Sequence, residues 1–379
     1  MRCSKADVVA LARSAVHGEC EIRVAPAFVD ERTRERLREA FARGDFTTWN
    51  YDDARADRAA DPRSILAGAK SVLCIAFAYA TPPPSRPRLS GRVSNYAWSG
   101  DYHRRLLQTL REIARRIDEC AGEPVTAVAC DTKPIAERAF AAKAGLGWIG
   151  KHTNLISPRL GSFVFLGEIL TTLDIEPDAP LQKSCGSCVR CVDSCPTGAL
   201  RGDYTIDATR CISDLTQRTD AIPREMRPLI GEWVWGCDMC QVACPPTHAA
   251  GDRGATSDTP RSQTAASPDL VGLLRLRAGE FRSTFRPTAM GWRGAAVLRR
   301  NAAVALGNAL DRASVPALIE VLEREPHAMV RAHAAWALGR IGSPAALDGL
   351  RSHVSREGDA EVREEIMLAM NAFSEVGPR

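Results

Sequence analysis

The cysteines constrain this chain more than any other feature, because eight of the thirteen are crowded between residues 185 and 244 of 379. The first run, CGSCVRCVDSCP, has the spacing C-x2-C-x2-C-x3-C-P, whereas the second, CDMCQVACP, has only C-x2-C-x3-C-P. Such spacing is typical of chains that bind two [4Fe–4S] clusters, each held by four thiolates. The runs supply seven ligands, and Cys211 is the one cysteine left between them. We therefore assign Cys211 as the eighth ligand.

Each run is expected to serve both clusters. A C-x2-C-x2-C loop brings three thiolates to one cluster, and the cysteine before the proline ligates the other cluster. Zinc also accepts C-x2-C pairs, but it shows no preference for the longer spacing, so we favour iron–sulfur. Two clusters in one chain indicate one-electron transfer. The predicted ligands are Cys185, Cys188, Cys191 and Cys244 for the first cluster, and Cys195, Cys211, Cys237 and Cys240 for the second.

The other five cysteines lie singly among apolar residues, and we expect them to be buried as small hydrophobic side chains. They are Cys3, Cys20, Cys74, Cys120 and Cys130. The N-terminal residues mix charged and apolar side chains, so they contain no stretch of signal-peptide length, and no later run approaches membrane-spanning length. We therefore expect a cytoplasmic protein in which clustered cysteines bind metal instead of forming disulfides.

Hydrophobic periodicity in the first half alternates between helical and strand patterns, which predicts an α/β (α+β) layer structure. Pro134 suits the first turn of a helix that stops at Gly145. Residues 247–270, rich in Gly, Ser, Thr and Pro, are predicted to form a linker or mobile loop. The expected helices cover residues 30–44, 101–120 and 134–144, and the expected strands cover residues 71–80, 124–130 and 162–173.

The C-terminal part contains a sequence repeat with a regular spacing. LRRNAAVALGN from Leu298, VRAHAAWALGR from Val330 and VREEIMLAM from Val362 align without gaps, and SVPALIEVLERE supplies a preceding helix. The pattern resembles HEAT-like helical repeats, in which paired helices stack because one pair cannot bury its own apolar faces. Unrelated Ala- and Leu-rich helices are the alternative. We expect about three repeat units.

Several motifs outside the cysteine runs resemble the epoxyqueuosine reductase family over a match from about Arg58 to Gly342. The resemblance implies a cobalamin-dependent oxidoreductase that reduces epoxyqueuosine to queuosine at the wobble position of tRNA, the last step of queuosine biosynthesis. Electrons would pass from the two [4Fe–4S] clusters to cobalamin, which carries the hard chemistry. The motifs are DTKPIAERAFAAKAGLGWIGKHTNLI, SFVFLGEILTTL, IPREMRPLIGEWVWGCDMCQ and RRNAAVALGN, with DPRSILAGAKSVL and YAWSGDYH earlier in the chain.

The resemblance also implies an architecture. The N-terminal domain would bind cobalamin with a fold like that of nitroreductases and reductive dehalogenases, and the ferredoxin-like part would lie against one face of the cofactor. The expected domains are a cobalamin-binding catalytic domain in residues 1–175, a ferredoxin-like two-cluster domain in 176–250, a linker with connecting helices in 251–290, and all-α HEAT-like repeats in 291–379.

The general acid of the family corresponds to Asp131, in the motif C-D-T-K-P. As an epoxide opens, its oxygen gains negative charge, and a nearby acid has to protonate it. Asp131 would need a raised pKa to hold that proton, which burial against corrin and substrate could supply. Its alternative role is to cap a helix that begins at Pro134. The resemblance implies cobalamin contacts by Arg58, Asp131, Leu155, Leu166, Ser213 and Gln241.

His103 is the nearest approach to a histidine ligand for cobalamin. In D-x-H-x-x-G, the histidine binds the lower face of cobalamin, but the sequence here is D-Y-H-R-R-L and lacks the glycine. We therefore interpret His103 as a packing or surface residue. The resemblance implies base-off cobalamin without a protein histidine ligand.

The net charge is only +4, but arginines gather in residues 261–300, where acids are few. This is compatible with a nucleic-acid partner and does not require one. For the tRNA that the resemblance implies, the expected contacts are Arg224, Arg299 and Arg331. The last two occupy equivalent places in successive repeats and could instead form an ion-pair ladder between helices, so both interpretations stay open here. An external electron donor is expected, no membrane is involved, and a monomer would suffice.

Two other functions fit part of the pattern. A reductive dehalogenase of a small organohalide would share corrin and clusters, but such enzymes usually carry an export signal and have no need of helical repeats. A non-catalytic electron-transfer module on a helical scaffold would bind no corrin. Corrin binding separates this last function from the first two.

Overall fold

The computed structural model describes residues 3–252 and 263–376, and the chain divides into two compact units. The first unit holds the described residues of 1–82, 101–209 and 238–259. The second holds those of 83–100, 210–237 and 260–379. The units interleave along the sequence, because the chain crosses from one to the other several times.

A four-stranded antiparallel sheet forms the centre of the first unit, in the order β1 (Cys20–Pro26), β2 (Ser71–Ala78), β7 (Val164–Thr171) and β4 (Thr126–Ala129). Every residue of β2 is buried, as its continuous apolar sequence SVLCIAFA requires of a strand covered on both faces. The three strands predicted from the sequence are confirmed as β2, β4 and β7. The helix-covered antiparallel sheet is of the α+β kind.

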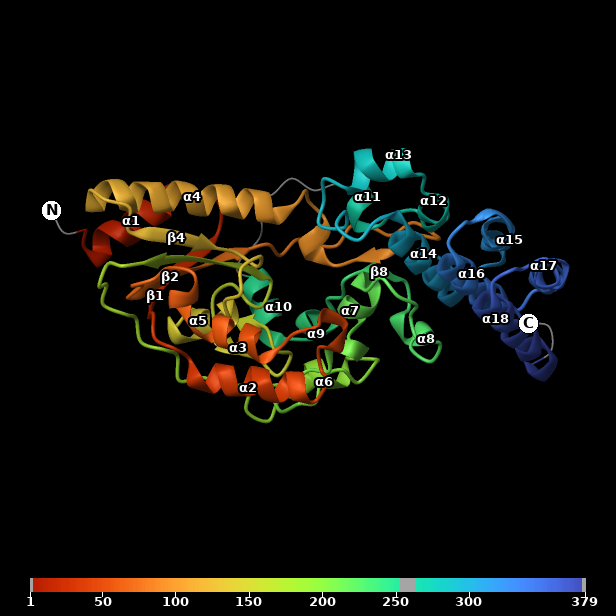
Figure 1. The fold of residues 1–379 in the computed structure, drawn as a ribbon, viewed down its shortest axis with the longest axis horizontal. Helices are drawn as coiled ribbons and strands as arrows, with labels where there is room; N and C mark the ends of the chain where they lie inside the picture. Colours follow the sequence, from red (N-terminus) through yellow and green to blue (C-terminus); the bar gives the residue numbers. More distant parts are fainter. Residues whose placement is uncertain (1–2, 253–262, 377–379) are drawn as a thin grey trace. The chain divides into compact units, whose positions relative to one another are not determined.

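Helices cover both faces of this sheet (Figure 1). On one face, α4 (Tyr102–Ala121) buries Leu106, Leu110, Ile113 and Ile117 at helical spacing and packs beside α1 (Lys5–Ala15). Asp101 caps α4 by accepting a hydrogen bond from the His103 N–H, and Gly122 ends it at a φ of +81°. On the other face, α5 (Glu137–Lys143) packs on β1, β2 and β7. The elements α2 (Glu31–Ala42) and α3 (Asp53–Ala60) pack on each other.

The helix predicted to start at Pro134 begins instead at Glu137. The reason is that residues 131–136 form an irregular loop, which is fixed where the Ala136 N–H donates to the Ala59 carbonyl at 2.8 Å. Asp131 is therefore too far from the helix to cap it. The predicted stop is confirmed, because Gly145 follows α5 with a φ of +78°.

Short elements carry the cysteine runs. Strands β5 (Trp148–Ile149) and β6 (Leu155–Ile156) form a hairpin, and the runs lie around the one-turn helices α6 (Arg190–Asp193) and α9 (Met239–Val242). The linker predicted at residues 247–270 is only partly observed. Residues 253–262 lie outside the described residues, and the flanking parts are helical rather than linker-like, in α10 (Pro245–Asp252), α11 (Gln263–Ala266) and the start of α12 (Leu270–Leu274).

The second unit contains the stacked helices that the repeat predicted. The three repeat motifs lie in α14 (Ala295–Ala309), α16 (Ala328–Ile341) and α18 (Ala360–Val376), with α15 (Val315–Arg324) and α17 (Pro344–Val354) as the alternate helices. Gly307 packs against Trp336 and Ala337, and Gly339, at the equivalent place in the next repeat, packs against Ala369, so closely that a Cβ on either glycine would collide. The repeat prediction is therefore confirmed.

The second unit also contains β3 (Arg92–Val93), α7 (Ile212–Gln217), α8 (Arg227–Ile230), β8 (Trp233–Trp235) and α13 (Ala278–Glu280).

The isolated cysteines differ from one another. Cys20, Cys74 and Cys130 are buried, as expected. Cys3 and Cys120 instead form a disulfide, with a Cα–Cα distance of 5.7 Å, that joins the segment before α1 to the last turn of α4. The expectation of two single buried thiols is wrong there, because α1 and α4 pack side by side and bring distant residues together. In the described part of the chain, no helix is both long and apolar enough to cross a membrane.

Candidate active site

Asp131 lies two residues after β4, and polar neighbours from the start of α4 surround its carboxylate. The Tyr102 hydroxyl donates to Oδ2 at 2.8 Å, and Nε2 of His103 lies 2.8 Å from the same oxygen. Nδ1 of His103 lies 2.7 Å from Oδ1 of Asp101. The Asp131 side chain is still 54% exposed, and its φ of +52° is in the left-handed region that non-glycine residues rarely adopt. A strained and accessible carboxylate of this kind is typical of a functional site.

The electrostatics of the site favour a protonated His103 beside an ionised Asp131. The hydrogen bond with His103 is the largest influence on Asp131, and it lowers the pKa of that carboxyl although burial opposes it. Burial lowers the pKa of His103, but the hydrogen bonds with Asp131 and Asp101 outweigh burial and leave that pKa raised. The pKa of Asp131 is therefore lowered by its protein neighbours, and the rise expected from burial against corrin and substrate stays a prediction. The interpretation of His103 as a packing or surface residue is wrong.

Two further carboxyl groups lie behind Asp131. Glu137, the first residue of α5, accepts a hydrogen bond from the Asp131 backbone N–H. Glu168, in the middle of β7, is completely buried, and among the described residues the Glu137 carboxyl is the one group placed to share a hydrogen bond with its carboxylate oxygens. Burial and the charge of Asp131 raise the pKa of Glu137 to about 7, and burial and Glu137 raise that of Glu168. Two facing carboxyl groups can share a hydrogen bond only when one is protonated, so this pair retains a proton.

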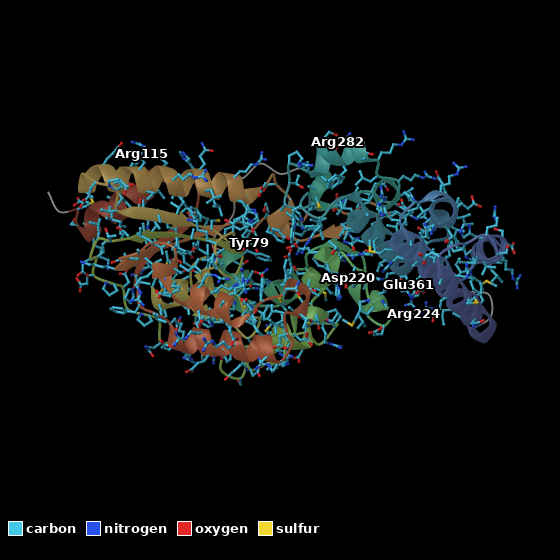
Figure 2. The ribbon with its side chains drawn as sticks, in the orientation of Figure 1. Tyr79, Arg115, Asp220, Arg224, Arg282 and Glu361 are labelled. Atoms are coloured by element: carbon cyan, nitrogen blue, oxygen red, sulfur yellow. A yellow bond between two sulfur atoms is a disulfide. The ribbon has the colours of Figure 1, made fainter. Side chains whose placement is uncertain are left out.

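A cluster of aromatic rings, most of them buried, lies beside these carboxyl groups. The Tyr102 ring stacks on Phe165, with ring centroids 4.3 Å apart and planes 9° apart. Phe165 in turn lies 4.3 Å from the Tyr79 ring, which is labelled in Figure 2, and Tyr79 makes an edge contact with Phe163. The rings come from the end of β2, from the segment leading into β7 and from the start of α4. This aromatic cluster thus adjoins the Asp131 carboxylate through Tyr102.

The predicted cobalamin contacts differ in accessibility. Leu166 is half-buried in β7, and its carbonyl oxygen lies 3.7 Å from the Cys130 thiol, next to Asp131. Leu155 is buried in β6, and Arg58 is exposed on α3. The structure therefore brings Leu166 beside Asp131, and the proposed corrin contacts of all three stay predictions.

The other two predicted cobalamin contacts lie on short helices beside cysteines. Gln241 is buried in α9, directly after Cys240. Ser213 lies in α7 of the second unit, two residues after Cys211, and its hydroxyl accepts a hydrogen bond from the Gln217 side chain at 3.1 Å. Their cobalamin contacts also stay predictions.

The four predicted ligands of the first cluster lie within the first unit, near one another. Burial raises the pKa of Cys191, and the thiolates of Cys185 and Cys188 raise it further. Burial raises the pKa of Cys244 to about 11, and Cys185 and Cys191 add to this effect. Among the described residues, no three His, Cys, Asp or Glu side chains converge on a single metal ion. A four-iron cluster does not require such convergence, since each thiolate binds a different iron. The donor set therefore fits a [4Fe–4S] cluster.

The four predicted ligands of the second cluster are divided between the units. Cys195 and Cys240 belong to the first unit, and Cys211 and Cys237 to the second. Cys211 directly precedes α7, and Cys237 follows β8 at the edge of the second run. This ligand set stays a prediction.

Comparison with known proteins identifies three segments of the chain. A family model described as "Epoxyqueuosine reductase QueG, DUF1730" matches residues 59–132, which end just after Asp131. A "4Fe-4S double cluster binding domain" matches residues 184–247, and "HEAT repeats" match residues 294–371.

Curated relatives cover most of the chain. An epoxyqueuosine reductase of Lactococcus garvieae is 38% identical over 282 residues, covering 73% of this chain and 80% of the relative. That of Bacillus subtilis is 34% identical over 286 residues, covering 74% of each chain. This chain belongs to the epoxyqueuosine reductase family.

Solved structures of epoxyqueuosine reductases share the fold. One holds a tRNA-Tyr stem loop modified with epoxyqueuosine, and it matches with 31% identity, a TM-score of 0.89 and coverage of 98% of both chains. Another, from Bacillus subtilis, has its catalytic aspartate loop swung out of the active site, with 31% identity, a TM-score of 0.89 and coverage of 97% of this chain and 98% of that one.

The family motif RRNAAVALGN fixes a segment of the second unit from α14. Arg300 is completely buried, and its guanidinium donates to the carbonyls of Leu215, Arg218 and Asp220 at 2.5 to 2.9 Å. Asn301 donates to the Thr216 and Val234 carbonyls at 2.7 and 2.8 Å. These two side chains therefore hold α7 and β8, the elements that adjoin Cys211 and Cys237.

The arginines predicted to contact tRNA all have carboxylate partners. Arg299 pairs with Glu325 at 3.1 Å, and Arg331 pairs with Glu357 through two hydrogen bonds of 2.8 and 2.9 Å. The two carboxylates also occupy equivalent places in successive repeats, so the geometry favours the ion-pair ladder. Arg224, labelled in Figure 2, pairs with Glu365. Their contact with tRNA stays a prediction.

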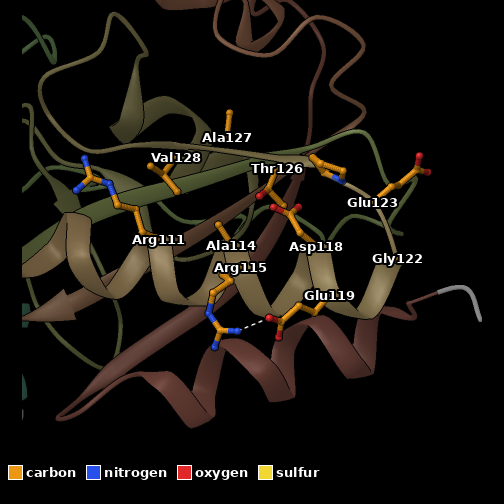
Figure 3. Close-up of a pocket in the computed structure, with 11 residues that line it drawn as sticks. Arg111, Ala114, Arg115, Asp118, Glu119, Gly122, Glu123, Thr126, Ala127 and Val128 are labelled. Atoms are coloured by element: carbon orange, nitrogen blue, oxygen red, sulfur yellow. Dashed lines mark hydrogen bonds and ion pairs between the residues drawn. The ribbon is translucent and has the colours of Figure 1, made fainter.

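A surface hollow of about 600 Å³ lies between α4 and β4, as Figure 3 shows. Its rim includes Arg111, Arg115 and Glu119, and Arg115 forms an ion pair with Glu119. None of the predicted site residues lines it. The hollow is therefore separate from Asp131 and its neighbours, whose geometry suits proton transfer.

Sequence reasoning missed Tyr102, Glu137 and Glu168 as members of the site. Tyr102 and His103 are adjacent in the family motif YAWSGDYH, and Glu137 and Glu168 lie within the quoted motifs ERAFAAK and FLGEIL. A glutamate in an otherwise apolar strand such as VFLGEILT is a signal that could have been used, because buried acids are rare unless they have a function.

Proposed function

We propose that this protein reduces epoxyqueuosine in tRNA to queuosine, as the last step of queuosine biosynthesis, with Asp131 as the catalytic residue that protonates the departing epoxide oxygen. The observation that carries the proposal is the Tyr102–His103–Asp131 cluster, which presents an accessible, proton-linked carboxylate in a chain of the epoxyqueuosine reductase family. The same family membership supports a tRNA substrate and a cytoplasmic location.

The reaction converts an epoxide to an alkene and releases its oxygen as water, which consumes two electrons and two protons. Cobalamin, when bound, would supply a low-potential metal centre that delivers electrons to the epoxide carbon. A cofactor beside Asp131 is supported by the accessible carboxylate and by the Leu166 carbonyl, which lies 3.7 Å from the thiol of Cys130, the residue before Asp131. In the proposal, Arg58, Leu155, Ser213 and Gln241 complete the contacts.

Proton delivery in this proposal runs through Asp131 and His103 as a pair. Asp131 touches the epoxide oxygen, and its proton comes from His103, which is 2.8 Å away and is the more basic member. Asp101 orients the imidazole from its other nitrogen. The Asp131 pKa rises once corrin and substrate cover the exposed carboxylate, because burial disfavours its charged form.

Glu137 acts as a positioning residue for Asp131. Its carboxylate binds the Asp131 N–H and so stabilises the left-handed backbone at that residue. Glu168, buried beneath it, keeps the Glu137 side chain in place by sharing a proton with it. The loop of residues 131–136 is thereby held with the Asp131 carboxylate toward Tyr102.

Electrons reach this site through the two proposed [4Fe–4S] clusters, one held by Cys185, Cys188, Cys191 and Cys244 and the other by Cys195, Cys211, Cys237 and Cys240. Each cluster would carry one electron at a time, so two clusters together hold the two electrons that one turnover consumes. A monomer suffices for this arrangement, since all eight thiolates belong to one chain.

The test is anaerobic reconstitution with iron, sulfide and cobalamin, followed by mass analysis of an anticodon stem loop that carries epoxyqueuosine. The proposal predicts a bound corrin spectrum and queuosine in the RNA. Absence of bound corrin would instead support an electron-transfer module. Corrin binding with turnover of a bromophenol, and none of the RNA, would indicate a dehalogenase.

A further inference from the structure

The outer side of the first cysteine run carries cations that have no carboxylate partner among the described residues. Lys183, just before the run, and Arg190, between Cys188 and Cys191, are exposed, and the Lys151 ammonium donates to the Gly186 carbonyl at 3.0 Å. No acidic residue occurs in residues 179–192. The nearest acid after this stretch is Asp193, on α6. The local charge of this surface is therefore positive.

Apolar side chains adjoin these cations. Val189 is 40% exposed and Val242 is 52% exposed, which is unusual for valine. They lie at the start of α6 and the end of α9, two helices that pack on each other, with the Ser194 hydroxyl 3.5 Å from the Met239 carbonyl. Lys151, Lys183, Val189, Arg190 and Val242 are called the cysteine-loop surface below.

The four predicted ligands of the first cluster are unequally covered. Cys191 and Cys244 are buried, Cys185 is half-buried, and Cys188, directly before Val189, is exposed. The loop tip is open, since a side chain placed at Gly186 would meet no atom within 4 Å. A redox partner can thus approach the Cys188 side of the cluster closely.

We propose that the cysteine-loop surface is the docking site for a small acidic one-electron carrier protein that bears a low-potential flavin or iron–sulfur group. Acidic side chains around the carrier's redox group would complement Lys151, Lys183 and Arg190, and the two valines would supply the apolar centre of the contact. Encounters for electron transfer bury little area, below about 1,200 Å², so five side chains around one exposed thiolate are a reasonable core.

The transfer step is simple. The reduced carrier loses one electron, the oxidised [4Fe–4S] cluster gains it, and no bond or proton moves. The alternative occupant is RNA, which binds positive surfaces through its phosphates. The exposed valines and the exposed cluster ligand favour a redox protein instead, because neither contributes to phosphate binding.

This inference rests on the iron–sulfur part of the proposed function and is independent of epoxide reduction. The experiment mixes reduced flavodoxin, and separately a reduced plant-type ferredoxin, with the oxidised reconstituted protein and follows bleaching of the cluster absorption. Binding of each oxidised carrier is measured by calorimetry. The test variant is Lys183→Glu/Arg190→Glu. We expect its second-order reduction rate at low ionic strength to fall about tenfold or more with at least one carrier, and its affinity for that carrier to fall in parallel.

The matched control is Arg13→Glu/Arg111→Glu, which makes the same charge change at two exposed arginines on α1 and α4, the helices on the face of the sheet opposite α5. It should reduce and bind as the unmodified protein does. Reduction by dithionite and iron content should be equal in all forms, which separates a docking defect from loss of the cluster. Equal carrier rates in test and control variants would overturn the proposal. So would weakened binding of the RNA stem loop with unchanged binding of both carriers.

Discussion

The acid site of the first unit and the helical repeats of the second use charged residues in opposite ways. In the repeats, the protein itself supplies the partners of the arginines. Arg331 forms an ion pair with Glu357, and Arg300 donates hydrogen bonds to backbone carbonyls. Around Asp131, the carboxyl groups of Asp101, Glu137 and Glu168 gather with His103, and among the described residues the buried Glu168 has no partner but a proton shared with Glu137. Charged groups with a full set of hydrogen-bond or ion-pair partners are compatible with a stable fold. Charged groups without such partners cost stability and are typical of functional sites.

The comparison is tested most strongly at Arg300. Arg300→Met removes the donors to three carbonyls of the α7 segment and leaves those oxygens buried without partners, so the free energy of unfolding should fall by about 3–5 kcal/mol. Urea denaturation measures this loss. Iron content should fall as well, because Arg300 holds the segment that follows Cys211. Arg299→Met, in the same helix, is the control and should lower the free energy of unfolding much less. Equal losses in the two variants would contradict the claim that Arg300 holds the α7 segment.

The opposite kind of charge is tested by His103→Asn, which removes the proposed proton source but leaves Asp131 in place. We expect kcat to fall about 100-fold, with little change in KM for the RNA, because proton transfer typically contributes a factor of about 10²–10⁴. In the unmodified enzyme, the rate should decline as pH rises through the raised pKa of His103, above its ordinary 6.5.

The pH profile distinguishes a proton source from a structural residue. The His103→Asn profile should lose that decline at high pH. Tyr102→Phe, which removes one hydrogen bond to Asp131 and no titrating group, should keep it. A His103→Asn enzyme with an unaltered profile would show that the imidazole does not supply the proton.

Glu168→Gln should stabilise the protein in a pH-dependent way. A carboxyl whose pKa is raised in the folded state binds its proton more tightly there, so its contribution to stability is lost as pH rises from the unfolded pKa through the folded one. The variant should therefore be more stable than the unmodified protein at pH 8 and equally stable at pH 4, a difference that thermal unfolding at the two pH values would detect. Turnover should fall nonetheless, because Glu137 loses its support. An equal gain at both pH values would mean that Glu168 is not protonated in the folded protein.

The smallest effect is expected at the ion-pair ladder. Arg331→Gln breaks the pair with the buried Glu357, which keeps hydrogen bonds with His353 and the Asp359 N–H, and should cost about 1.5 kcal/mol in urea denaturation. Arg331 lowers the pKa of Glu357 to about 2, so this cost should be present at neutral pH and vanish as pH falls through that value. Affinity for the RNA stem loop should not change if the ladder is the whole role of Arg331. A clear loss of RNA affinity, measured by fluorescence anisotropy, would instead support the prediction that Arg331 contacts tRNA.

The sequence predicted what depends on local spacing and missed what depends on packing. The cysteine spacing and the C-terminal repeat are short-range patterns, and both were recognised by the comparisons with known families. The start of α5 was misplaced because Pro134 is a weak signal against a loop fixed by the distant Ala59 carbonyl. His103 and the Cys3–Cys120 disulfide were misread because each meets its partner only after α4 has packed in the fold.

The acid site itself was only half predictable. Asp131 was found through a motif, but its pKa depends on Tyr102 and His103, which are distant from it in sequence. Glu168 is paired with Glu137 only because β7 is central in the sheet and α5 crosses it. Such groupings are set by the strand order, which no periodicity in the sequence specifies.

The central claim is that Asp131 delivers a proton to an epoxide oxygen in tRNA. The most direct test is a single turnover of the fully reconstituted, prereduced protein with the epoxyqueuosine stem loop, comparing the unmodified enzyme with Asp131→Asn. The account predicts that the unmodified enzyme yields RNA lighter by one oxygen atom, and that Asp131→Asn, with equal iron, corrin and RNA affinity, is slower by about 10³-fold. Equal rates in the two proteins would contradict it.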